Sequence, residues 1–210
     1  NSSLQIYMNT YFWEFKSIMI ASFLGIYALS TFTAFLLVPR LVLYIEKRSI
    51  LLIAIAFAAL IPPIPIILYL NDLLPDSGSW GLFYALTPFI YLGNTCLSSS
   101  AIVRESMLGD ISDEVELESK LGQQGLMYAS SSLIGKLNTG LGILVAGLAL
   151  EFIGFPQGSE ILPNADQIFS LAMVQGPFVA ILMIIPFGIF SFYSIDRQKH
   201  KKILDQLAVR

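Results

Sequence analysis

The chain has 210 residues, of which 55% are hydrophobic and only 13% are charged. Soluble domains carry about 25% charged residues because their surfaces face water, so this composition excludes a soluble fold and indicates a lipid bilayer as partner. A single cysteine and a single histidine exclude a disulfide scaffold and a Cys/His zinc site, and a net charge of −3 lacks the basic face that nucleic acid binding requires.

Five apolar stretches are each long enough to cross a hydrocarbon core about 30 Å thick. They predict an all-α integral membrane domain over residues 1–210, with spans at 17–38, 49–70, 80–103, 124–155 and 167–193. Pro39 is expected to end the first span. Three prolines in the middle of the second are expected to kink it, which membrane helices tolerate: Pro62, Pro63 and Pro65.

The charges between these spans predict the topology. Ten of the twelve lysines and arginines lie between the first two spans, in the loop 104–123 or in the tail 194–210, whereas the loops on the other side contain none. Because positive charge marks the inner side, we expect residues 104–123 to form an acidic helical loop in the cytoplasm, and we expect a cytoplasmic C-terminal tail and a location in the plasma membrane, as in a bacterial inner membrane.

The first residues predict that the chain is a fragment. It starts with Asn1 and lacks a signal segment, although the topology places residue 1 outside. Residues 6–15 are rich in aromatic side chains and are interpreted as the outer end and aromatic belt of a preceding helix, the alternative being an exposed aromatic loop. With that helix there are six spans, so we expect a missing N-terminal half of six helices in the same polypeptide.

Lys136 lies in the middle of the fourth span, some 15 Å from either end at about 1.5 Å per residue. A lysine at that depth costs about 2.5 to 3.5 kcal/mol, so we expect it to face inward, toward a counter-charge or a water-filled cavity. The five spans contain no acid at mid-membrane depth. An acidic partner of Lys136 is therefore expected outside this chain.

The residues around Lys136 favour a binding role. Tyr128, Ser132 and Thr139 recur with it at spacings of four, four and three, which places all four on one helix face. Such a face suits a hydroxylated or anionic ligand. Asn94, in the third span, is a further candidate for binding substrate, and the alternative is that it forms a hydrogen bond between helices. The same two interpretations apply to Gln175 in the fifth span.

Residues 106–156 carry the most specific pattern. It consists of an acidic D-x-x-D-E loop, Gly125 at the start of the fourth span, Tyr128 eight residues before Lys136, and an L-x-x-I-G-F ending. On these residues the chain resembles the C-terminal half of the glycoside-pentoside-hexuronide:cation symporters, the melibiose-carrier branch of the major facilitator superfamily. The resemblance implies that its spans are the eighth to twelfth of that fold.

The resemblance also implies roles for individual residues. Asp110 and Asp113 match loop aspartates of a cytoplasmic charge network that locks one conformation, the alternative being a solvated acidic loop. Lys136 matches a lysine near the cation and sugar sites, and Ser132 a neighbouring sugar-facing position.

Two departures from the family pattern stand in this sequence. Where the family often has basic residues just before the glycine that corresponds to Gly125, this chain has Gly-Gln-Gln at residues 122–124. The cytoplasmic charge network implied by the resemblance is therefore weakened or has other partners. Small residues around Ala101 replace a sugar-stacking tryptophan, which argues against galactoside specificity.

These observations predict a secondary active transporter that carries a sugar or related small solute with a cation by alternating access, with no catalytic residues and no cofactor. The coupling ion, Na⁺ or H⁺, is expected to bind in the N-terminal half, where the family's cation-binding aspartates lie. One alternative is the same fold carrying a lysophospholipid or another amphiphile. Another is a membrane assembly subunit or a membrane enzyme, but an enzyme needs convergent acid, His or Cys groups that these spans lack.

Overall fold

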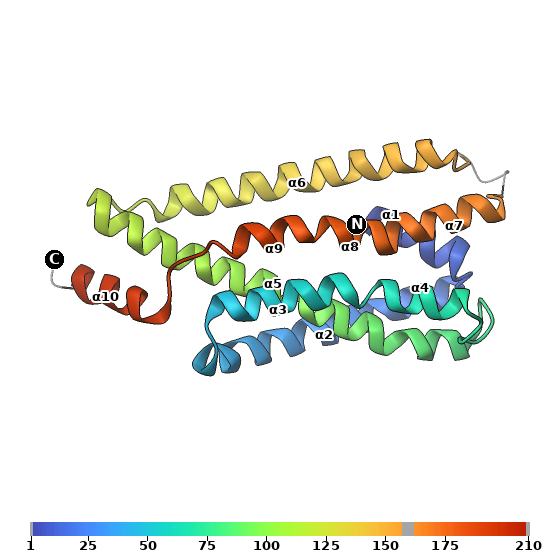
Figure 1. The fold of residues 1–210 in the computed structure, drawn as a ribbon, viewed down its shortest axis with the longest axis horizontal. Coiled ribbons are helices and arrows are strands. Elements are labelled where there is room, and N and C mark those ends of the chain that lie inside the picture. Colours follow the sequence, from blue (N-terminus) through green and yellow to red (C-terminus); the bar gives the residue numbers. More distant parts are fainter. Residues whose placement is uncertain (1, 157–161, 209–210) are drawn as a thin grey trace.

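The computed structural model describes residues 2–156 and 162–208, and this part of the chain forms a bundle of long, roughly parallel helices (Figure 1). The N-terminal half of the bundle comprises α1 (Ser2–Tyr7), the π-helical segment η1 (Met8–Phe12), α2 (Ser17–Tyr44), α3 (Lys47–Leu60) and α4 (Pro63–Leu70). The remainder comprises α5 (Trp80–Ser119), α6 (Gln124–Ile153), α7 (Ala165–Met173), the π-helical segment η2 (Val174–Phe178), α8 (Val179–Leu182), α9 (Ile184–Phe190) and α10 (Arg197–Ala208).

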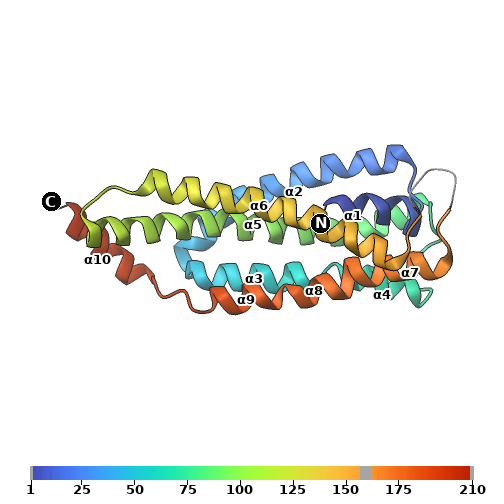
Figure 2. The ribbon, with the colours of Figure 1, turned by 90° about the horizontal axis from the view of Figure 1, so that it is seen from above.

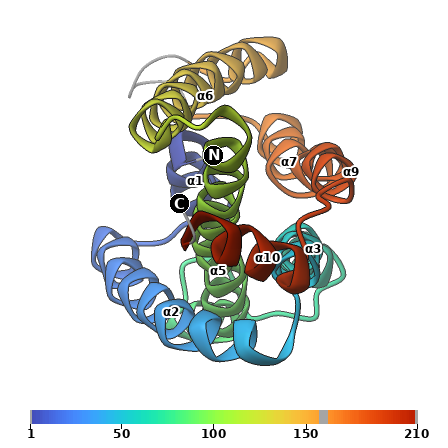
Figure 3. The ribbon, with the colours of Figure 1, turned by 90° about the vertical axis from the view of Figure 1, so that its left-hand side faces the viewer.

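The longest helix, α5, lies in the middle of the bundle when it is viewed end-on (Figure 3). Both α2 and α3 pack against it, and α9 lies alongside α3 (Figure 2). In contrast, α6 lies at the periphery, where Ala146 is its one buried residue. We refer to the end of the bundle that carries α10, the α2–α3 junction and the α5–α6 junction as the α10 end (Figure 1).

Four helical segments of the described residues are long and apolar enough to cross a membrane: Ser17–Tyr44, Lys47–Leu70, Gln124–Ile153 and Ala165–Phe190. They correspond to four of the five expected spans. The expected span at 80–103 forms the first part of α5 and contains several polar residues, among them Asn94 and Thr95. The prolines of residues 62–65 separate α3 from α4, in agreement with the predicted kink.

One expected boundary is wrong. Pro39 does not end the first span, because α2 continues through it to Tyr44; losing one backbone hydrogen bond is tolerated in a membrane helix. Residues 104–119 are helical, as expected for the acidic loop, because α5 continues to Ser119 and keeps Val103, Met107 and Asp110 buried on one face at helical spacing. The tail at 194–210 contains a further helix, α10.

An aromatic cluster holds together the end of the bundle opposite α10. The rings of Phe12 and Trp13 lie edge to face, and that of Phe15 packs against Phe23 and Phe83. Phe12, Trp13 and Phe15 are buried, so these three side chains do not form the aromatic belt that was expected at residues 6–15. They pack inward because α1 and η1 lie against the other helices rather than at the surface of the bundle.

A glycine allows α4 and η2 to approach each other closely. A Cβ atom on Gly176 would lie 2.7 Å from Cδ1 of Ile66 and 3.7 Å from Cα of Pro63. Ile66 is itself buried, so a larger side chain at position 176 has space only if the Ile66 side chain moves or the two helices separate. In contrast, a Cβ atom on Gly188 meets nothing within 4 Å.

We therefore predict that Gly176→Leu destabilises the protein by about 2 kcal/mol, the usual cost of overpacking an interior contact. Gly188→Leu is the matched control and should leave the stability unchanged. Thermal unfolding of the purified protein measures both, and equal unfolding temperatures for the two variants would contradict the close α4–η2 contact.

Candidate substrate cavity and charge network

A buried carboxylate lies at the α10 end of the bundle. Asp110, on α5, is only 5% exposed. Its two carboxylate oxygens accept hydrogen bonds from Nζ of Lys47 at 2.7 and 2.8 Å. Lys47 is the first residue of α3, so this ion pair joins α3 to the middle of the acidic part of α5.

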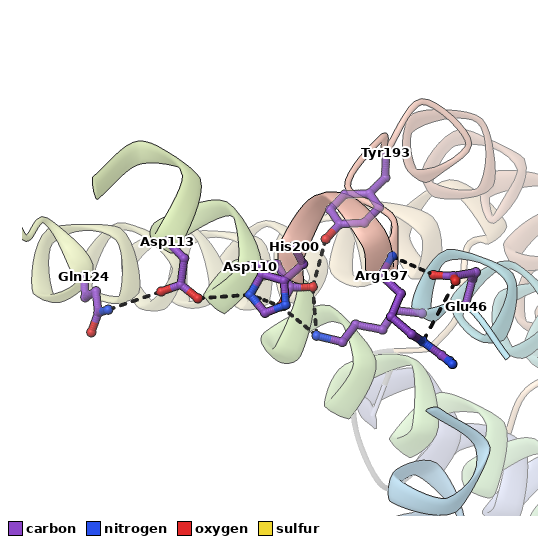
Figure 4. Close-up of polar contacts among 8 residues, drawn as sticks. Glu46, Asp110, Asp113, Gln124, Tyr193, Arg197 and His200 are labelled. Carbon is purple, nitrogen blue, oxygen red and sulfur yellow. Dashed lines mark hydrogen bonds and ion pairs between the residues drawn. The ribbon is translucent and has the colours of Figure 1, made fainter. Parts of the chain in front are cut away.

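Two further groups from the C-terminal part of the chain reach the same carboxylate (Figure 4). The hydroxyl of Tyr193, just after α9, donates a hydrogen bond to Oδ2 of Asp110 at 3.1 Å. Burial raises the pKa of the Tyr193 phenol, and the negative charge of Asp110 raises it further, so this hydroxyl remains a donor. Nε2 of His200, on α10, lies 3.4 Å from Oδ1 of Asp110.

His200 also connects Asp110 to Asp113. Its Nε2 atom lies 3.1 Å from Oδ2 of Asp113, and Nε2 of Gln124 donates to Oδ1 of the same aspartate at 3.5 Å (Figure 4). Next to this pair, Nζ of Lys199 lies 2.6 Å from Oε1 of Glu114. One face of α10 is therefore bound to the acidic part of α5.

Arg197 attaches the start of α10 to the end of α2. Its guanidinium donates hydrogen bonds to the backbone carbonyls of Val42, Leu43 and Ile45, which lie where α2 ends. Its Nε atom is also 4.0 Å from a carboxylate oxygen of Glu46 (Figure 4). The last carbonyls of a helix have no partners within the helix and carry partial negative charge, so a guanidinium stabilises this terminus.

We call Lys47, Asp110, Asp113, Gln124, Tyr193 and His200 the charge network. It joins the end regions of α3, α5, α6, α9 and α10 through one pair of aspartates. Because a buried carboxylate that loses its partner is costly, these helix ends either move together or separate only when other groups satisfy Asp110.

The two predicted gate aspartates thus occupy one network, in which Gln124 contacts Asp113. Sequence reasoning did not identify Lys47, Tyr193 and His200 as their partners. The acidic excess was an available signal, because six acids face only two basic residues within 104–123, so their counter-charges must come from other parts of the chain.

A cavity of about 850 Å³ lies between α1, η1, α2, α4, α5 and η2. Most of its lining residues are apolar or aromatic, including Trp13, Phe23 and Phe89. Six of them have polar side chains: Gln5, Asn9, Ser17, Tyr27, Asn94 and Gln175. None of the described residues that line the cavity is charged.

Asn94 and Gln175 are the two candidate binding residues that line this cavity. The Nδ2 atom of Asn94 donates to Oγ of Ser30 at 2.6 Å, which joins α5 to α2. The predicted alternative of a hydrogen bond between helices is therefore confirmed for Asn94. Gln5, Asn9 and Tyr27 were missed, because their polar atoms are brought together only by the packing of three helical segments.

The other predicted binding residues lie on α6, away from the cavity. Lys136, Ser132, Tyr128 and Thr139 are exposed, and none of them lines the cavity. The hydroxyl of Thr139 donates to the carbonyl of Gly135 at 3.0 Å. Within residues 2–156 and 162–208 no ion pair is formed by Lys136, so an acidic partner from outside this chain remains a prediction.

Comparison with known proteins adds independent information. A family model described as "MFS/sugar transport protein" matches residues 1–197. A protein of Synechocystis sp. named "Uncharacterized symporter" is 29% identical over 141 residues, which are 65% of this chain and 25% of that relative. The match thus spans a quarter of the relative's length. No solved structure matches the chain.

We predict that Lys47→Ala destabilises the protein by about 3 kcal/mol, the low end for breaking a buried pair because Lys47 itself is partly exposed. The double variant Lys47→Ala/Asp110→Ala removes both charges and should recover part of the lost stability. Chemical or thermal unfolding of the full-length protein measures this coupling. Additive losses from the two substitutions would show that the pair is not coupled.

Proposed function

Since the chain belongs to the MFS/sugar transport protein family, we propose that it forms the C-terminal six-helix half of a cation-coupled symporter for a sugar or related small solute. The family match makes the protein a multi-pass membrane transporter rather than an enzyme. In such transporters a substrate binds near the bilayer midplane between two halves, which rock to expose it to either side. The predicted resemblance to sugar symporters is thereby confirmed at the level of the family.

The observation that best supports alternating access is the charge network. It gathers two aspartates, a lysine and a histidine at one end of the bundle, where a gate has to close and open. The excess of lysine and arginine at this end supports a cytoplasmic position for it, with the C-terminus inside a plasma membrane. Asp110 and Asp113 are accordingly proposed as part of the cytoplasmic gate.

We place the substrate-facing surface of this half on α6. Lys136 is exposed in the middle of a long apolar helix, and its neighbours on the same face are also exposed. A lysine in this position is costly in lipid, so the face fits a polar cavity shared with an N-terminal half. There Lys136 binds substrate or responds to the charge of carboxylates that hold Na⁺ or H⁺.

The apolar walls of the cavity between α1, α2 and α5 favour a second candidate function. They suit an amphiphile, such as a lysophospholipid, carried by the same fold. Uptake by vesicles that contain the full-length transporter, measured with a sugar panel and a lysophospholipid panel, separates the two candidates. Sugar uptake driven by a cation gradient supports the first, and lipid uptake alone supports the second.

We predict that Lys136→Ala in the full-length transporter abolishes cation-driven uptake and leaves its abundance in the membrane near normal, because the Lys136 side chain is exposed on α6. Lys136→Arg is the matched control that keeps the charge and should retain part of the uptake. Radiolabelled solute uptake measures both variants. Full uptake by Lys136→Ala would exclude the proposed role of this lysine.

A further inference from the structure

The imidazole of His200 lies between two carboxylates. Its Nε2 atom is 3.1 Å from Oδ2 of Asp113 and 3.4 Å from Oδ1 of Asp110 (Figure 4). Both aspartates belong to α5, whereas His200 belongs to α10. A single ring nitrogen is therefore shared by two acids, and it connects the C-terminal helix to the central one.

The two carboxylates differ in their other partners. Asp110 also accepts hydrogen bonds from Nζ of Lys47 and from the hydroxyl of Tyr193. Among the residues that the structure describes, His200 is the one basic side chain within 4 Å of the Asp113 carboxylate. The other contact of Asp113 is the neutral amide of Gln124, at 3.5 Å. Whether Asp113 has a nearby counter-charge thus depends on the protonation of His200.

A proton on the ring changes how well it fits this position. A neutral imidazole has one N–H group, so its Nε2 atom donates to one carboxylate at most and, in the other tautomer, to neither. A protonated imidazole donates from both nitrogens and is positively charged. Asp110, Asp113 and Lys47 together carry one net negative charge, which a protonated His200 cancels. The contact between α10 and α5 is therefore stronger when the ring is protonated.

The other ionisable groups around the ring have partners of their own. Glu114 and Lys199 form an ion pair at 2.6 Å, and Arg197 contacts Glu46. Burial and the charge of Asp110 raise the pKa of Tyr193, so its hydroxyl stays neutral. Carboxylates, lysines and arginines do not ordinarily titrate between about pH 5 and 8, whereas histidines do. The complete set around the ring is Glu46, Lys47, Asp110, Asp113, Glu114, Tyr193, Asp196, Arg197 and Lys199.

Solvent has access to the ring while α10 is in place. The His200 side chain is 24% exposed. It also lines a cavity of about 210 Å³ together with Asp110, Lys47 and Arg197. A proton from the surrounding solution can thus reach the imidazole without prior separation of α10 from α5.

We propose that His200 is a proton-sensitive switch, which attaches α10 to α5 when it is protonated and weakens that attachment when it is neutral. The attachment is strong at about pH 6 and weakens as the pH rises toward 8, because the proton is then lost. This inference rests on the proposed gate and concerns its regulation. While α10 is attached, His200 contacts both gate aspartates, so the gate should open more slowly at acidic pH.

The test measures how often α10 separates from α5. Ile203, on α10, is buried, whereas its neighbour Leu204 is exposed, and α10 packs against α5. Ile203→Cys and Leu204→Cys are made separately in a full-length transporter without other reactive cysteines and labelled with a maleimide at pH 6 and pH 8. Dividing the rate at position 203 by the rate at 204 removes the effect of pH on the thiol itself. We expect this ratio to rise about tenfold from pH 6 to pH 8, the effect of losing one hydrogen bond between charged groups.

Variants of the ring assign the effect to His200. His200→Gln is neutral at both pH values, so its ratio should stay at the high level that the unsubstituted position 200 gives at pH 8. His200→Arg is always charged and should give a low ratio at both. Lys201→Gln, which removes an exposed charge from the next residue, is the matched control and should keep the tenfold response. A ratio independent of pH with His200 present would overturn the proposal, as would an unchanged response in His200→Gln.

Labelling requires no transport, so the two proposals fail separately. If labelling responds to pH but the transporter accumulates no solute, the proposed transport function fails and the switch stands. If it accumulates solute but labelling is independent of pH, only the switch is excluded. The uptake of His200→Gln relative to the wild type should be greater at pH 6 than at pH 8 on the α10 side of the membrane. An equal relative uptake at both would exclude regulation of the gate.

Discussion

The burial of one carboxylate determines how the helices meet at one end of this protein. Asp110 is almost completely enclosed, and an enclosed carboxylate requires partners that compensate for its lost hydration. Lys47, Tyr193 and His200 supply them from three separate segments. Asp110 therefore joins α3, the segment after α9 and α10 to α5, in addition to the apolar packing and the other ion pairs at this end.

This arrangement relates the fold to transport. The central helix α5 carries the charge network at one end and Asn94 beside the cavity nearer its middle, so any displacement of α5 affects both. In alternating access, a gate has to be stable enough to close and weak enough to open. For the gate that we propose, a carboxylate with several partners meets that requirement, because each partner can be exchanged in turn while the charge stays compensated.

Much of the helical architecture was predictable, because hydropathy reports directly on burial in lipid and four expected spans match helices of sufficient length. The end of the first span was not predictable in this way. A proline usually breaks a helix, but α2 continues through Pro39 to Tyr44. Asp110 was identified through a family motif. Its partner Lys47 is 63 residues away, and no local pattern encodes a contact of that kind.

The central claim is that Asp110 holds α10 against the start of α3. The most direct test measures the distance between spin labels at exposed positions 48 and 202 in the full-length transporter, after Arg48→Cys and Lys202→Cys in a background without other reactive cysteines. Pulsed electron paramagnetic resonance should give a narrow distance distribution, which broadens toward longer distances when Asp110→Asn removes the charge. An equally narrow distribution in that variant would contradict the account.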